Sequence, residues 1–105
     1  MKPLEEIAFE IISSVGSARS SYIMAIDLAE EGKVEEALES IEEGKEFYNE
    51  GHKAHKELLT LLANGELPSI DLLLAHAEDQ LMSAETFGIL AERFVKLYKK
   101  LNVSE

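Results

Sequence analysis

Apolar residues recur at steps of three and four positions along three long stretches of the chain. This spacing is typical of amphipathic α-helices, whereas the β-branched alternation of a strand is absent. The stretches run from about residue 3 to 31, from about 34 to 63 and from about 70 to 101. We therefore predict an all-α fold in which three long helices, joined by short connections, pack as an antiparallel three-helix bundle.

The ends of the predicted helices carry local start and stop signals. Pro3 opens the first helix and Gly32 supplies its stop. Asn64-Gly65 is a turn signal at the end of the second helix, and Ser69 is the expected N-cap of the third. At 105 residues, the chain is predicted to form a single domain, residues 1–105.

Each predicted helix has one row of positions at heptad-like spacing that we expect to face the core. In the first helix the row is Leu4, Ala8, Ile11, Val15, Ala18, Tyr22, Ala25 and Ala29. In the second helix, apolar at both ends and polar in between, it is Val34, Leu38, Ile41, Lys45, Tyr48, His52, His55, Leu59 and Leu62. In the third helix it is Leu74, Ala77, Leu81, Ala84, Gly88, Ala91, Val95 and Tyr98.

The third helix is apolar around most of its circumference. Two further rows are mainly apolar: Leu73, His76, Gln80, Ser83, Phe87, Leu90, Phe94, Leu97 and Leu101, and Leu72, Ala75, Asp79, Met82, Thr86 and Ile89. The narrow remainder, which we expect to face solvent without a function, is Asp71, Glu78, Glu85, Glu92, Lys96 and Lys99. A helix of this kind needs cover on more than one side, which predicts a homo-oligomer with this helix at or near the symmetry axis.

The net charge of the chain limits the classes of partner that it can bind. The formal net charge is −11 and the few basic residues are mostly dispersed. Nucleic acids and anionic membranes need clustered Lys or Arg, so both are excluded, while a small basic protein stays compatible. No Cys is present, which removes disulfides and thiolate chemistry. We find no signal peptide and no apolar run long enough to span a bilayer, and expect a cytoplasmic protein.

Three polar residues interrupt the apolar rows of the third helix. Asp79 and Gln80 lie three and four positions after His76, so the three side chains can be neighbours. A carboxylate beside a histidine orients the imidazole and raises its basicity, which suits a nucleophilic or proton-transferring histidine. The alternative is a semi-buried polar cluster that gives packing specificity.

Two further histidines lie one turn apart on the second predicted helix. His52 and His55 have a spacing at which metal ligation is conceivable. The Glu-x-x-His pairs of a carboxylate-bridged di-metal bundle are missing, however. Histidines satisfied at a helix interface are therefore the favoured interpretation.

Several segments of the chain occur in the order of one known family. They are Glu10-Ile11-Ile12-Ser13, Val15-Gly16-Ser17-Ala18-Arg19-Ser20, Ala25 through Gly32, Glu35-Glu36-Ala37, Gly51-His52-Lys53-Ala54, Gly65-Glu66-Leu67-Pro68 and His76-Ala77-Glu78-Asp79-Gln80-Leu81-Met82. Together they make nearly the whole chain resemble the lactose/cellobiose (N,N′-diacetylchitobiose) enzyme IIA family of the phosphoenolpyruvate-dependent sugar phosphotransferase system. The ordered set is more specific than any single segment.

This resemblance implies a homotrimer of spectrin-repeat-like three-helix subunits. It places the phosphorylated histidine of the family's His-Ala-Gln-Asp-His-Leu-Met motif at His76, and the aspartate that binds a divalent cation near the three-fold axis at Asp79. Oxygen-only ligands on a symmetric axis favour Mg²⁺. The implied activity is phosphoryl relay from the carrier HPr, through His76, to a cysteine of a cognate IIB component that works with a membrane IIC component. The substrate class would be a β-linked disaccharide of the lactose/cellobiose type.

The chain departs from the family motif at two positions. The second histidine of the motif is Gln80 here, and its Gln is Glu78. We expect Gln80, Ser83 and His55 to support the phosphoryl group at His76. Position 55 usually carries Gln in the family, so we hypothesise that a His/Gln exchange between residues 55 and 80 preserves the local hydrogen bonding. The rival function is a non-catalytic helical interaction or regulatory module that retains the IIA fold.

Overall fold

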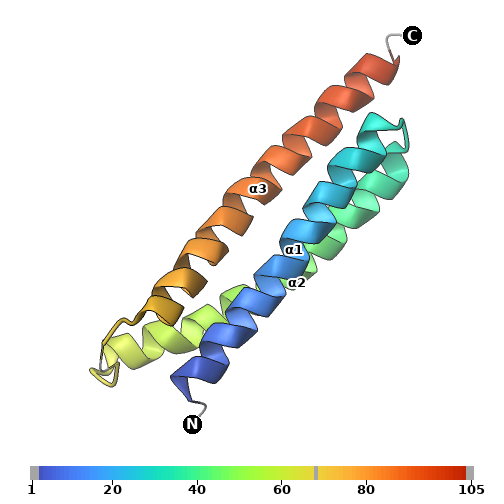
Figure 1. The fold of residues 1–105 in the computed structure, drawn as a ribbon. Helices are drawn as coiled ribbons and strands as arrows, with labels where there is room; N and C mark the ends of the chain where they lie inside the picture. Colours follow the sequence, from blue (N-terminus) through green and yellow to red (C-terminus); the bar gives the residue numbers. More distant parts are fainter. Residues whose placement is uncertain (1–2, 68, 104–105) are drawn as a thin grey trace.

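The computed structural model describes residues 3–67 and 69–103, and these form an elongated bundle of three helices measuring 58 × 19 × 17 Å (Figure 1). Helix α1 spans Leu4–Glu30, α2 spans Val34–Ala63 and α3 spans Leu72–Val103. No strand occurs in this part of the chain. The all-α three-helix bundle is thereby confirmed.

The turns after α1 and α2 depend on glycine. Gly32 has a φ of 85° and Gly65 a φ of 71°, the left-handed region that side chains with a Cβ rarely adopt. Both glycines therefore stop their helices as predicted. Helix α3 begins at Leu72, two residues later than predicted. The Leu74 amide donates a 2.9 Å hydrogen bond to the Asp71 carboxylate, so the N-cap is Asp71 and not Ser69.

The predicted core rows of α1 and α3 are confirmed. From Ala8 to Ala29, every member of the α1 row is buried, and so is every member of the α3 row from Leu74 to Val95. The buried residues form two clusters. One contains Ile11 and Leu58, and the other contains Tyr22 and Ile41.

The predicted core row of α2 is wrong. Its members Leu38, Leu59 and Leu62 are about half exposed, at 48, 49 and 59%. Ile41 is the one member of the predicted row that α2 buries, and the other buried residues are Ala37, Gly44, Gly51, Ala54, Leu58 and Leu61. The small residues among them decide the packing because they let α1 approach closely. A Cβ on Gly51 would lie only 2.7 Å from Cγ1 of Val15.

Tyr22 joins all three helices at the middle of the bundle. Its ring, 4% exposed, passes from α1 between Gly44 of α2 and Gly88 of α3. A Cβ on Gly44 would lie 2.5 Å from Cε1 of the ring, and a Cβ on Gly88 would lie 2.8 Å from its Cζ. The two glycines therefore form the slot that the tyrosine fills.

Helix α3 lies along one side of the α1–α2 pair and packs more on α1 than on α2 (Figure 1). Its side turned away from the core, hereafter the outward face, carries large apolar side chains that the single chain leaves exposed. They are Leu72, Met82, Ile89, Leu90, Phe94, Leu97 and Leu101. None of the described helices has the length and apolar character needed to cross a membrane.

Candidate functional site

His76 lies in the second turn of α3 and is exposed to solvent. Asp79 is also exposed, whereas Gln80 and Ser83 are partly buried. Successive residues of an α-helix turn by about 100°, so these four project from the side of α3 opposite Leu74. The structure thus brings the predicted site residues of α3 to one accessible face.

The exposure of His76 and Asp79 bears on the alternative interpretation from the sequence, a semi-buried polar cluster that gives packing specificity. In the single chain the apolar rows that they interrupt form the outward face, which is open to solvent, so neither side chain loses hydration. The His76 imidazole is consequently accessible to a second molecule.

His55 is the predicted site residue that the structure places elsewhere. Its side chain is 13% exposed, and its Nε2 hydrogen-bonds to Oε1 of Glu78 across the α2–α3 contact. The hypothesised exchange required His55 to take its hydrogen bond near Gln80, and the structure gives it to Glu78 instead. The expectation that Glu78 faces solvent without a role is therefore wrong.

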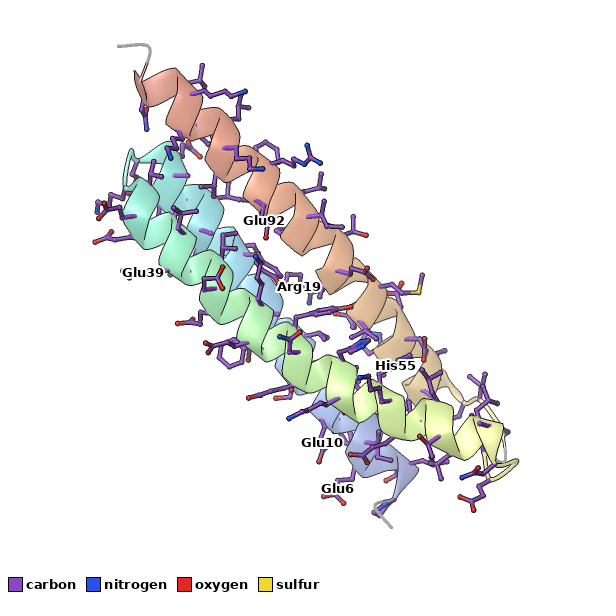
Figure 2. All side chains as sticks on the ribbon, turned by 180° about the vertical axis from the view of Figure 1, so that it is seen from behind. Glu6, Glu10, Arg19, Glu39, His55 and Glu92 are labelled. Carbon is purple, nitrogen blue, oxygen red and sulfur yellow. The ribbon has the colours of Figure 1, made fainter. Side chains whose placement is uncertain are left out.

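Glu78 is the first of three acidic residues on α3 that reach across to α2. Glu85 hydrogen-bonds to Tyr48, and Glu92 lies 2.8 Å from the Lys45 ammonium. We call these three pairs, His55–Glu78, Tyr48–Glu85 and Lys45–Glu92, the polar seam. Figure 2 shows His55 and Glu92 pointing from their own helices toward the neighbouring one. The predicted solvent row is thus in part an interhelical contact.

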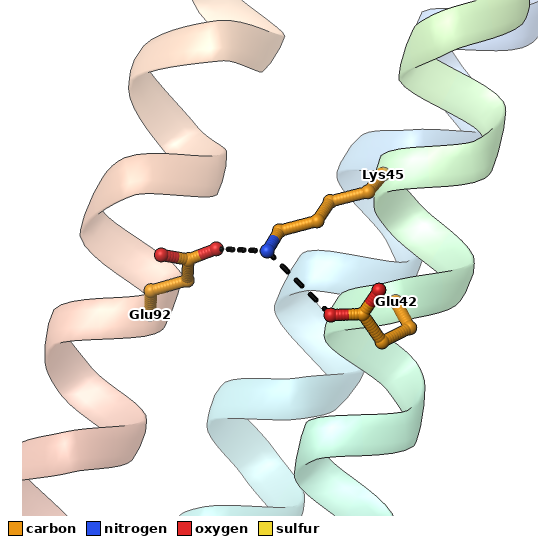
Figure 3. A network of polar contacts seen from close by, with 3 residues as sticks. All are labelled: Glu42, Lys45 and Glu92. Atoms are coloured by element: carbon orange, nitrogen blue, oxygen red, sulfur yellow. Dashed lines mark ion pairs between the residues drawn. The ribbon is translucent and has the colours of Figure 1, made fainter.

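The far end of the polar seam is an open ion-pair network. The Lys45 ammonium lies between Glu92 and Glu42, at 2.8 and 3.5 Å (Figure 3). The hydrogen bond to Glu92 raises the pKa of Lys45, and the negative charges of both carboxylates add to this. Burial raises the pKa of Tyr48, and the charge and hydrogen bond of Glu85 raise it further. The raised pKa values of Lys45 and Tyr48 mean that both side chains keep the protons with which they hold the seam together.

The remaining histidine of α2 makes an aromatic contact. His52 stacks on Tyr48, with ring centroids 6.2 Å apart and an angle of 19° between the planes. Among the described residues of one chain, no group of three or more His, Cys, Asp or Glu side chains is placed to hold a metal ion. His55 lies at a helix interface, as favoured from the sequence, whereas His52 is exposed and stacks on a residue of its own helix.

Comparison with known proteins decides the family. The sequence model of the PTS system lactose/cellobiose-specific IIA subunit matches residues 6–99, nearly the whole chain. This chain belongs to the lactose/cellobiose-specific IIA family. IIA components belong to the sugar phosphotransferase system and transfer phosphoryl groups.

This chain is similar to individual members of the IIA family over most of their length. The lichenan-specific phosphotransferase enzyme IIA component of Bacillus subtilis (strain 168) is 37% identical over 93% of this chain and 89% of its own. The galactose-specific EIIA component of Lactococcus lactis subsp. cremoris (strain MG1363) is 38% identical over 94% of this chain and 85% of its own. The crystal structure of the cellobiose-specific enzyme IIA from Bacillus anthracis superposes with a TM-score of 0.93 at 40% identity, covering 100% and 97% of the two chains.

Within this IIA chain, sequence reasoning missed the role of Glu78. The signal that could have found it is the heptad spacing of Glu78, Glu85 and Glu92, which fixes all three on one strip of α3. In an antiparallel bundle their partners must run in reverse order along α2. His55 and Tyr48 do so at the same seven-residue interval.

Proposed function

We propose that this IIA chain is a phosphocarrier that accepts a phosphoryl group from phospho-HPr on His76. It then passes the group to a cysteine of its cognate IIB component, during uptake of a lactose/cellobiose-type disaccharide through the membrane IIC component. The observation that carries the proposal is the accessible His76 imidazole on the outward face of a IIA fold. The sugar itself would be bound by the membrane component.

The proposed transfer needs little from the protein beyond position and charge. A neutral ring nitrogen of His76 attacks the phosphorus of the donor's phosphohistidine, so one N–P bond forms as the other breaks. The transferred group has to lie in line between the two rings. Gln80, one helical turn after His76, and Ser83, two turns after it, project from the same side as the imidazole. Their amide and hydroxyl groups are suited to donate hydrogen bonds to the phosphoryl oxygens.

The active assembly is proposed to be a homotrimer built on the outward face of α3. Leu90 and Leu97 are 50 and 49% exposed in the single chain, and Phe94 is 41% exposed. Contiguous apolar surface of this kind marks a protein–protein contact. The apolar positions of this face repeat at heptad spacing, so the same row on a second copy of α3 can pack against it.

A divalent cation at the axis of this trimer is proposed to bind through Asp79. Asp79 lies on the outward face, in heptad register with Leu72, so copies of its carboxylate would converge wherever the helices meet. Converging carboxylates repel unless a cation or shared protons offset their charge. Carboxylate oxygens fit Mg²⁺, which when bound would neutralise that charge beside His76.

The test is phosphoryl transfer from phosphoenolpyruvate through enzyme I and HPr, followed by intact mass. We expect one acid-labile phosphoryl group per chain in the wild type and in His52→Ala, a matched histidine control on α2, and none in His76→Ala. Sedimentation of the same samples should give the mass of a trimer. A folded trimer that stays unphosphorylated beside a competent HPr would instead support the non-catalytic interaction or regulatory module.

A further inference from the structure

In the pair of the polar seam nearest His76, the α2 side chain is more deeply set than in the pair at the far end. The His55 side chain is 13% exposed, whereas Lys45, which makes the pair at the far end, is 47% exposed. Glu78, the partner of His55, lies between His76 and Asp79 in the sequence of α3. A contact made by a partly buried group on α2 therefore holds the turn of α3 that carries the proposed acceptor.

Helix geometry links the direction of Glu78 to that of His76. Two residues along an α-helix correspond to a rotation of about 200°, so Glu78 and His76 project from nearly opposite sides of α3. When His55 holds Glu78 against α2, His76 is directed away from α2. Rotation of this part of α3 about its own axis would displace the His76 imidazole and the Asp79 carboxylate together.

The core contact of α3 at the level of His76 is small. Leu74 and Leu81 are buried one turn to either side, but the core residue between them is Ala77, whose methyl group offers little interlocking shape. Helix α3 also packs less on α2 than on α1, so few other contacts oppose a turn on that side. The His55–Glu78 hydrogen bond is consequently the directional contact that α2 supplies at this level.

We propose that His55 and Glu78 are positioning residues, which set the rotation of α3 and thereby aim His76 at the phosphoryl donor. This inference rests on the proposed phosphocarrier function. In this proposal His55 does not contact the phosphoryl group, because its Nε2 is hydrogen-bonded to the Glu78 carboxylate. His55 acts on His76 only through Glu78. In-line transfer is sensitive to such aim, because a misplacement of about 1 Å costs on the order of 100-fold in rate.

The experiment compares substitutions in two pairs of the seam. His55→Ala removes the contact beside His76, and Glu85→Ala removes the corresponding contact one heptad further along α3. We expect His55→Ala to lower kcat for phosphorylation by phospho-HPr about 10-fold or more, with KM changed less than about 2-fold. Glu85→Ala should stay within about 2-fold of wild type in both constants.

A conservative variant separates positioning from general destabilisation. The amide of His55→Gln can still donate a hydrogen bond to Glu78, so this variant should recover most of the rate lost in His55→Ala. The rates are compared at equal helicity by circular dichroism. The proposal is overturned if His55→Ala and Glu85→Ala behave alike, or if the rate of His55→Gln stays as low as that of His55→Ala.

A readout independent of phosphoryl transfer distinguishes failure of the positioning role from failure of the proposed function. The chain has 3 histidines, so each ring signal in a ¹³C-labelled sample can be assigned by substituting them one at a time. The His76 ring signal should shift or broaden in His55→Ala and keep its wild-type position in Glu85→Ala. If wild type accepts no phosphoryl group, the phosphocarrier function fails. If the His76 signal is unchanged in His55→Ala, the positioning role fails whatever the transfer assay shows.

Discussion

The slot that Gly44 and Gly88 form around Tyr22 gives the sharpest stability prediction. In Gly44→Ala, the new Cβ would lie 2.5 Å from Cε1 and 2.7 Å from Cδ1 of the tyrosine ring. The ring cannot retreat, because Gly88 closes the slot on the other side. Overpacking a core typically costs about 1–3 kcal/mol, and a ring confined from both sides belongs at the upper end.

Part of this cost is offset by helix propensity. Replacing Gly by Ala inside a helix stabilises it by roughly 1 kcal/mol. We therefore expect Gly44→Ala to lower the free energy of unfolding by about 2 kcal/mol. For a domain of this size, each kcal/mol lowers the thermal midpoint by roughly 4–8 °C. Urea unfolding followed by far-UV circular dichroism, at one fixed chain concentration because of the proposed trimer, measures the change.

Two controls make the steric argument refutable. A Cβ on Gly16, in the middle of α1, would meet nothing within 4 Å, so Gly16→Ala should show only the helix-propensity gain of up to about 1 kcal/mol. In a Tyr22→Leu background the ring is gone, and Gly44→Ala should cost at least about 1 kcal/mol less than in wild type. The reasoning is refuted if Gly44→Ala is as stable as wild type, or if its cost is unchanged without the ring.

Three further predictions test the cap of α3, the raised pKa values and the proposed subunit contact. Asp71→Ala should lower the free energy of unfolding by about 0.5–2 kcal/mol through loss of the α3 cap, and Asp71→Asn should retain most of it, as urea unfolding would show. The raised pKa values of Tyr22, Tyr48 and Lys45 mean that the folded state holds these protons more tightly than the unfolded chain. The stability that these groups contribute is complete below their pKa values in the unfolded chain, near 10, and is lost as pH rises through their higher pKa values in the folded state. The urea midpoint should therefore fall above about pH 10. A midpoint that stays level there would show that these groups do not contribute. Leu97→Glu would place a charge in the proposed subunit contact and should convert the trimer to monomers in sedimentation; an unchanged mass would contradict the use of the outward face.

The fold was predictable from sequence because its signals are local. The core rows of α1 and α3 repeat at heptad spacing, and Gly32 and Gly65 mark the turns without reference to the rest of the chain. The start of α3 was mispredicted at Ser69, since Ser69 and Asp71 are both good caps by type. Only the folded chain shows which one accepts the Leu74 amide.

The core row of α2 was mispredicted because hydrophobicity favours large side chains over small ones. The predicted row contained Leu59 and Leu62, whereas the buried row contains Gly44 and Gly51. The buried row is selected by how closely α1 can approach, which depends on the absence of a side chain. The Tyr22 ring of α1 occupies the space left beside Gly44, and the periodicity of α2 gives no sign of this contact.

The sequence indicates candidate site residues but not their surroundings, and the reason lies in the outward face of α3. A strip that is exposed in one chain and proposed to be covered in a trimer reads as buried in a hydrophobicity pattern. Most of the large apolar residues of this face, such as Leu90 and Phe94, lie in the C-terminal half of α3, while its N-terminal half carries His76 and Asp79. In the proposed homotrimer the C-terminal half supplies most of the subunit contact, and the N-terminal half brings the Asp79 carboxylates to the axis. His76 has to stay accessible to a partner protein beside them, as a histidine that receives and donates a phosphoryl group requires.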